Sequence, residues 1–323
     1  MAIHSVFGVY LANLAYLNYK WVERNIDSIF PSEKNKEIYW MTAWGGYINA
    51  TRFYNDLFKL LKLQFERAVD YLSSGKQMIT SGFGRSPEDS LSEHLVVACL
   101  NGQDDIIKPN SLLRRFARIP NNPSATHAVQ FIANLAKDEM IFREFSELNR
   151  KSFWPQAKVF WEIRIDIANN QRMKRKAKEE DAFDREFSRY ISWLDDLPDD
   201  VTLKELETLL ADTIKINRRG WDLPNLIEYL SKHSELHPLI AVRLFEQLTR
   251  TDAPTYFYQG KEQEIEVLLT NAIKTKKNEA YYYADQIVNK FGEWGNYYFK
   301  DFWKANLKEK KISRLKTPML KKK

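Results

Sequence analysis

The stretch LPNLIEYLSKHSELHPLIAVRLFEQL, from Leu223 to Leu248, decides the fold, because its apolar residues recur at helical spacing on both sides of a short polar turn. The turn falls at Lys232–His237, so the stretch predicts two helices that pack against each other. Residues Ile265–Phe291 repeat this pattern, with a turn near Lys276–Glu279. The recurrence fits the period of about 40–47 residues that is typical of HEAT and armadillo repeats. We therefore expect an all-α fold of paired antiparallel helices, arranged as a HEAT/TPR-like α-solenoid.

Helical periodicity also covers the N-terminal half of the chain, but it is more irregular there. A polar break at Leu197-Pro198-Asp199-Asp200 separates this half from the repeats. We expect an irregular helical domain at residues 1–196, a HEAT-like repeat region at residues 197–306 and a basic, flexible tail at residues 307–323.

Two local features of the N-terminal half carry specific expectations. Residues Met1–Leu17 are apolar but short of the roughly 20 apolar residues that cross a membrane. They predict a buried first helix rather than a membrane contact. Ser90 followed by Glu93 predicts a capping box that opens a later helix, and the apolar spacing of Arg52–Leu72 predicts one continuous helix.

The net charge of +6 comes from the tail, because residues Lys308–Lys323 hold eight basic residues and one acid. The rest of the chain is close to neutral, which argues against a nucleic-acid-binding body.

The single cysteine, Cys99, excludes an intrachain disulfide and a zinc site built from several cysteines, and its apolar neighbours predict a core residue. The N-terminus has no charged region ahead of its apolar run, so we expect a cytoplasmic protein.

The motifs that usually carry catalysis or cofactor binding are absent from the sequence. It contains no P-loop (G-x-x-x-x-G-K-[ST]), no H-E-x-x-H zinc motif and no G-x-S-x-G nucleophile elbow. His233 and His237 alone have an i,i+4 spacing, and a turn separates them. We therefore predict no catalytic, cofactor-binding or metal-binding residues.

Aromatic residues make up 14% of the chain, and some of them are expected at binding faces. Three consecutive tyrosines begin at Tyr281, and because successive helical residues point about 100° apart, at least one should be exposed. Trp40, Trp44 and Tyr47 share one helix face and predict inter-helix core instead. The candidate partner-binding residues are Tyr281, Tyr282, Tyr283, Lys310, Lys311 and Arg314.

A second basic stretch, Arg172–Lys178, is followed at once by Glu179, Glu180 and Asp181. Ion pairs one helical turn apart explain this stretch without nucleic acid. The charges of the tail are not balanced in this way.

Several short stretches between Trp40 and Arg164 carry a resemblance to a known group of proteins. They are Trp40–Tyr47, Tyr54–Phe58, Phe65–Ala68, Ser92–Leu95, Leu100–Gly102, Leu112–Phe116 and Trp161–Arg164. Together they resemble the C-terminal helical region of large bacterial antiphage defence proteins, namely STAND-type NTPases and some sirtuin-like defence proteins. The resemblance spans Met1–Trp303 but includes no NTPase, sirtuin or nuclease module. It implies a helical-repeat recognition region for a phage protein or a partner subunit, without inherited enzymatic activity.

These observations favour a non-enzymatic helical-repeat scaffold or sensor that binds another protein, in a setting of antiphage defence. The alternative is a nucleic-acid-associated helical protein that works through its Lys-rich tail. An enzyme with a site assembled from distant polar residues is the third and least favoured hypothesis.

Overall fold

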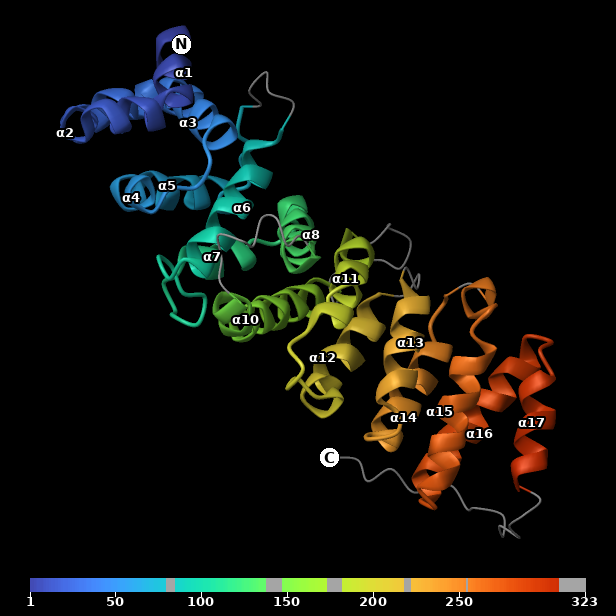
Figure 1. Cartoon of the computed structure of the whole chain (residues 1–323). Coiled ribbons are helices and arrows are strands. Elements are labelled where there is room, and N and C mark those ends of the chain that lie inside the picture. The colour runs from blue at the N-terminus through green and yellow to red at the C-terminus, as the bar shows by residue number, and fades with distance from the viewer. Residues whose placement is uncertain (80–84, 138–146, 173–181, 218–221, 254, 308–323) are drawn as a thin grey trace. The chain divides into compact units, whose positions relative to one another are not determined.

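The computed structural model describes residues 1–79, 85–137, 147–172, 182–217, 222–253 and 255–307 (Figure 1). These residues form sixteen α-helices and three short 3-10 helices and include no β-strand, which confirms the predicted all-α class. The chain divides into two compact units, Met1–Ala182 and Phe183–Lys323. This division comes earlier in the chain than the expected boundary after residue 196.

The first unit holds nine of these α-helices. They are α1 (Ala2–Val9), α2 (Leu11–Ile29), α3 (Glu37–Ala50), α4 (Asn55–Leu60), α5 (Lys62–Ser73), α6 (Pro87–Leu100), α7 (Leu112–Ala117), α8 (Pro123–Lys137) and α10 (Glu147–Arg172). The expectation of one helix over Arg52–Leu72 is wrong, because the chain breaks at Leu61 between α4 and α5.

The start of α6 also differs from the expected capping box. Ser86 is its N-cap, and the Ser86 side chain accepts a hydrogen bond from the Asp89 backbone amide. Pro87 occupies the first turn, where its missing N–H costs nothing. Ser90 therefore lies inside the helix, where its hydroxyl donates to Asn49 Oδ1 at 2.7 Å. Helix α6 ends at an Asn101 C-cap, and Gly102 follows it with a φ of +66°.

Helices α1 and α3 cross closely because small residues meet at the crossing. A Cβ atom on Gly8 would lie 2.0 Å from the backbone oxygen of Ala43. A Cβ atom on Gly46 would lie 2.7 Å from the backbone oxygen of Ser5. Only glycine fits at both positions, so backbone contact rather than large side chains holds α1 in place.

The expectation of a buried first helix is wrong as a result of this crossing. Gly8 is the only residue of α1 that is buried, and Ile3 and Val6 are exposed. The face that packs on α3 carries the small residues, and Ile3 and Val6 lie outside this contact.

The core of the first unit is an aromatic cluster centred on α3. Trp40, Trp44 and Tyr47 are at most 1% exposed, as their spacing predicts. The Trp40 and Trp44 rings stack at 6.3 Å, and Phe65 of α5 meets Trp44 edge-on at 5.0 Å. Trp40 Nε1 donates to Gln64 Oε1 at 2.9 Å, which satisfies the polar end of a fully buried ring.

Arg164 of α10 is a buried cation, with 1% of its surface exposed. Its Nη1 atom donates to the carbonyl oxygens of Ala117 and Ile119, both at 2.9 Å. Ala117 ends α7, where helical carbonyls lack partners within the helix. Arg164 therefore ties α10 to the C-terminal end of α7.

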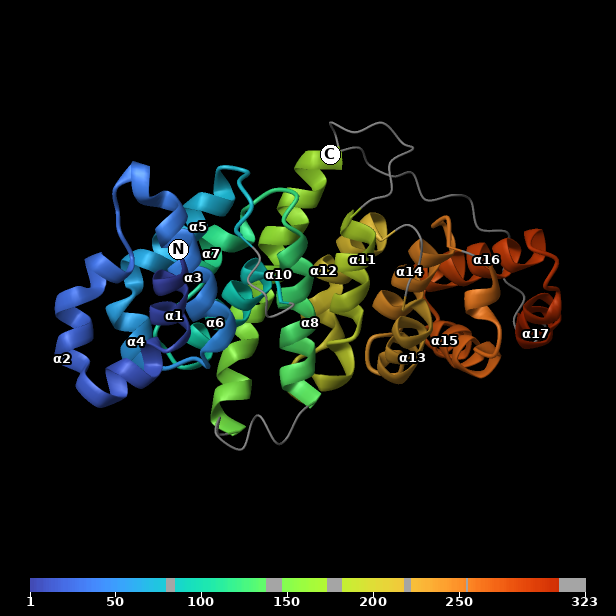
Figure 2. The ribbon, with the colours of Figure 1, turned by 90° about the horizontal axis from the view of Figure 1, so that it is seen from above.

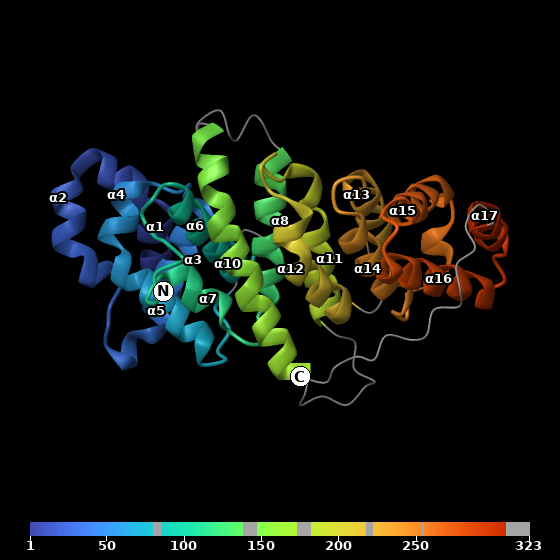
Figure 3. The ribbon, with the colours of Figure 1, turned by 90° about the horizontal axis from the view of Figure 1, so that it is seen from below.

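The second unit consists of successive helices that contact one another in pairs. They are α11 (Ala182–Ile191), α12 (Leu203–Ile216), α13 (Leu223–His233), α14 (Pro238–Thr249), α15 (Glu262–Lys274), α16 (Asn278–Glu293) and α17 (Tyr298–Leu307). The turns after His233 and Lys274 lie where the sequence predicts them. Helix α14 contacts both α12 and α16 in one layer, and α13 contacts α15 in another (Figures 2 and 3).

Equivalent positions of the repeated pairs are packed alike. Ala241 of α14 and Ala284 of α16 are both fully buried. Polar contacts join neighbouring pairs: Asn271 Nδ2 donates to Ser234 Oγ at 2.8 Å, and Gln247 Nε2 donates to the Ala211 carbonyl at 2.6 Å. Buried polar contacts of this kind fix the register of the helices, because sliding a helix would leave them unpaired.

Candidate partner-binding site

The structure separates the three consecutive tyrosines of α16 into two groups. Tyr281 is 6% exposed, its hydroxyl donates to the Ile273 carbonyl at 3.1 Å, and its ring lies 6.3 Å from that of Trp303. Tyr282 and Tyr283 are half-buried, with ring centroids 5.5 Å apart. Any contact of this tyrosine run with a partner therefore falls to Tyr282 and Tyr283.

Tyr283 lies beside charged residues of the same helical layer. Partial burial raises the pKa of Tyr283, with a further upward contribution from Glu279, while Arg243 acts in the opposite direction. Arg243 of α14 forms an ion pair with Glu207 of α12. Tyr283 therefore lies near the Arg243–Glu207 ion pair.

The basic part of the predicted binding set has no structural description. Lys310, Lys311 and Arg314 lie outside the described residues, as do residues 173–181 of the second basic stretch. Within the residues that are described, no group of three or more His, Cys, Asp or Glu side chains could hold a metal ion. No described helix has the length and apolarity needed to cross a membrane.

Cys99 is 2% exposed, as its apolar neighbours predict. Burial raises the pKa of its thiol, so the thiolate form that reacts as a nucleophile is disfavoured.

His94 is the most strongly perturbed histidine, and its surroundings are structural. The rings of Tyr47, Phe53 and Phe65 lie 5.8–6.1 Å from the imidazole. His94 Nε2 donates to the Thr51 carbonyl at 3.1 Å, and Nδ1 is buried without a partner in the described structure. Burial lowers the pKa of His94 from 6.5 to about 4. The imidazole is therefore neutral at pH 7 and packs as a polar member of the aromatic core.

The buried neutral His94 predicts a loss of stability in mild acid. The unfolded chain takes up a proton below pH 6.5, whereas folded His94 resists protonation until about pH 4. Its contribution is thus complete above pH 6.5 and falls as the pH drops toward 4, by up to about 3 kcal/mol. Urea unfolding followed by tryptophan fluorescence at several pH values measures this slope.

Two variants separate His94 from the other acid-sensitive groups. H94F should flatten the slope between pH 6.5 and 4, whereas H127Q should keep it. His127 accounts for none of the loss, because hydrogen bonding to Glu93 raises the pKa of His127 and its contribution disappears as the pH rises. An unchanged slope in H94F would contradict the assignment.

Sequence reasoning missed an exposed apolar surface on the first unit. Most of the exposed large apolar side chains of the described structure belong to residues 1–63. We call this set the N-terminal apolar surface: Met1, Ile3, Val6, Tyr10, Tyr16, Leu17, Tyr19, Trp21, Ile38, Tyr39, Tyr54 and Leu63. Tyr16 is 91% exposed and Leu17 is 76% exposed. Single exposed apolar residues are ordinary on soluble proteins, whereas here most of them are concentrated in one segment of the chain.

A bend in α2 determines the position of part of the N-terminal apolar surface. Asn18 has non-helical angles (φ −156°, ψ 86°), and its Oδ1 accepts from the Trp21 backbone amide at 3.0 Å. Asn18 therefore acts as an internal N-cap that restarts the helix. Tyr16, Leu17 and Tyr19 flank this bend.

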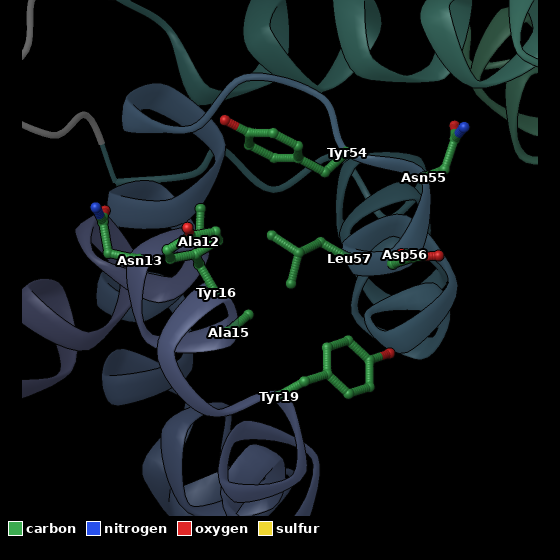
Figure 4. Close-up of a pocket in the computed structure, with 9 residues that line it drawn as sticks. All are labelled: Ala12, Asn13, Ala15, Tyr16, Tyr19, Tyr54, Asn55, Asp56 and Leu57. Carbon is green, nitrogen blue, oxygen red and sulfur yellow. The ribbon is translucent and has the colours of Figure 1, made fainter.

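A groove opens between α2 and α4 beside the bend. Its volume is about 460 Å³, and its lining residues are Ala12, Asn13, Ala15, Tyr16, Tyr19, Tyr54, Asn55, Asp56 and Leu57. Tyr19 and Tyr54 lie on opposite sides of the opening, with Leu57 between them and Ala15 facing Leu57 from α2 (Figure 4). The volume lies within the range of about 300–1,000 Å³ that is usual for ligand pockets.

Two carboxylates contribute negative charge at the groove. The pKa of Tyr19 is raised first by partial burial and then by the negative charges of Glu23 and Asp56. Among the described residues, neither carboxylate forms an ion pair. The groove thus combines aromatic rings, a small apolar floor and negative charge.

Comparison with known proteins identifies no relative: no family profile, no curated protein and no solved structure matches this chain.

Proposed function

We propose that this chain is a non-enzymatic helical-repeat scaffold or sensor that binds another protein through the N-terminal apolar surface. The observation that carries the proposal is the concentration of exposed Tyr, Trp, Leu, Ile and Val side chains on α1 and α2, with Tyr54 at the N-cap of α4. Leaving a Leu side chain in water forgoes roughly 1.5–3 kcal/mol relative to burying it. A partner that covers several such residues recovers this free energy. Tyrosine and tryptophan are also frequent at the energetic centre of protein interfaces.

The packing of α1 supports a preformed surface. The close backbone contact of Gly8 with Ala43 fixes α1 against α3, and α3 lies in the aromatic core. A surface held in this way loses little conformational freedom on binding, which favours affinity.

The second unit supports the repeat part of the proposal. Helices α13 to α16 contact both the next helix in sequence and a helix two positions away, as expected if α13–α14 and α15–α16 are HEAT-like pairs of an α-solenoid. Tyr282 and Tyr283 give this unit a further candidate contact.

We further propose that the protein works in bacterial antiphage defence, which the sequence resemblance favours, and in the cytoplasm, which the N-terminal sequence favours. Within that resemblance, Trp44, Phe116 and Trp161 are fully buried and Arg164 is buried as well. These residues therefore belong to the helical core of this chain, whereas the apolar surface is where a phage protein or a defence-complex subunit would dock.

Affinity purification of matched variants from infected and uninfected host cells tests the proposal. A Y16S/L17S variant should lose the co-purifying protein, because the two side chains are 91% and 76% exposed and contribute little to the core. An L236S/V267S variant removes two exposed apolar residues of the second unit and should retain it.

The same experiment decides against the proposal in two cases. One is that no protein co-purifies in a fixed ratio with the wild-type chain. The other is that nucleic acid co-purifies instead and is lost when residues 308–323 are deleted, which would favour nucleic-acid binding through the tail.

A further inference from the structure

The groove between α2 and α4 offers aromatic rings and negative charge but no positive charge of its own. None of its lining residues is a lysine or arginine. We propose that this groove receives a lysine or arginine side chain of the bound protein. This inference rests on the proposed function, and it adds the chemistry of the partner residue.

The aromatic rings provide the first part of the site. A cation is attracted to the face of a tyrosine ring within about 6 Å. The same unit already uses this contact internally: the Arg67 guanidinium lies 4.3 Å from the Trp40 ring centroid, and Lys76 Nζ lies 4.8 Å from that of Tyr71. In the described structure, no cation covers Tyr19 or Tyr54.

The carboxylates provide the second part. Glu23 and Asp56 both raise the pKa of Tyr19, so both act on the same rim of the groove. Arg24, which follows Glu23 in sequence, donates from Nε to the Lys20 carbonyl at 3.1 Å and forms no ion pair with Glu23 in the described structure. A cation placed at this rim is attracted by both carboxylates at once.

The floor of the groove suits the stem of the same side chain. Ala12, Ala15 and Leu57 present small apolar groups. Lysine and arginine bury their methylene stems on apolar surface while the charged end stays near solvent or a carboxylate. The volume of about 460 Å³ also leaves room for residues that flank the cation.

Methyl NMR of the full chain tests the inference with simple probes. The methyl groups of Ala12, Ala15 and Leu57 report on the groove during titration with N-acetyl-arginine amide or with the neutral analogue N-acetyl-citrulline amide. We expect saturable shifts of these methyl signals with arginine alone. In an E23Q/D56N variant the arginine affinity should fall by roughly fivefold, and raising the salt concentration should weaken binding to the wild type.

A D27N/E66Q variant is the matched control, because it removes two carboxylates from α2 and α5 that do not line the groove. Its arginine affinity should equal that of the wild type. Equal shifts with citrulline, unchanged affinity in E23Q/D56N, or no shift at the groove would each overturn the inference. If a partner protein is lost with Y16S/L17S while the arginine titration fails, the protein-binding function stands and only the cation assignment falls.

Discussion

Replacing Arg164 with methionine is expected to lower the free energy of unfolding of the first unit by roughly 2–6 kcal/mol, at 1–3 kcal/mol for each buried carbonyl group that loses its donor. Arg164 is 1% exposed, and its Nη1 atom serves the carbonyl oxygens of both Ala117 and Ile119. Methionine preserves much of the apolar volume but leaves these two carbonyls without their donor. The loss arises from buried polar groups and not from a cavity.

Urea unfolding of R164M, compared with R118M, measures this effect. Arg118 caps the same end of α7 but is exposed, so R118M should change stability by no more than about 0.5 kcal/mol. Equal stability of R164M and R118M would show that the carbonyls at the end of α7 find other partners.

Replacing Gly8 with alanine is expected to cost about 2–3 kcal/mol and to release α1 from α3. The new Cβ atom would meet the Ala43 backbone oxygen at 2.0 Å, and backbone cannot rotate away as a side chain can. Hydrogen exchange of residues 2–9 should increase in G8A more than that of the rest of the unit.

Gly292 provides a matched control for this substitution. It lies in α16, and a Cβ atom there would have no neighbour within 4 Å. G292A should be neutral or stabilising by up to about 1 kcal/mol, because alanine favours a helix over glycine. Since that propensity gain is also available at Gly8, the difference between the two variants isolates the α1–α3 crossing. Similar stability of both variants would refute the close contact.

The sequence predicted the second unit well because its signals are local. Apolar spacing and polar turns lie within one helix pair, so the turns after His233 and Lys274 were placed correctly. The start of α6 was misplaced by one turn, because Ser86 and Ser90 are both followed three residues later by an acidic side chain. Only the hydrogen bond of Ser90 to Asn49 in the folded protein distinguishes Ser90 from Ser86, the actual N-cap.

The exposed surface of α1 and α2 could not be predicted, because it depends on a long-range crossing. The apolar pattern of residues 1–17 is that of a buried helix, yet the contact with α3 uses Gly8 instead of Leu17 or Val6. The groove also joins residues from separate helices, Tyr19 and Tyr54, that no local pattern connects. The tyrosine run of α16 was found from sequence, but which of its members is buried followed from packing against Trp303.

The polar contacts between helix pairs of the second unit have an evolutionary consequence. Asn271 reaches Ser234, and Gln247 reaches Ala211, so each contact joins positions about one repeat apart. In stacked helix pairs each pair contacts only its neighbours, so adding or removing a whole pair leaves the register within the remaining pairs unchanged. Inserting one residue within a helix would instead rotate everything after it by about 100° and separate the partners. If the second unit is a solenoid, as proposed, the chain gains or loses length in steps of roughly forty residues, and each step adds surface without redesigning the core.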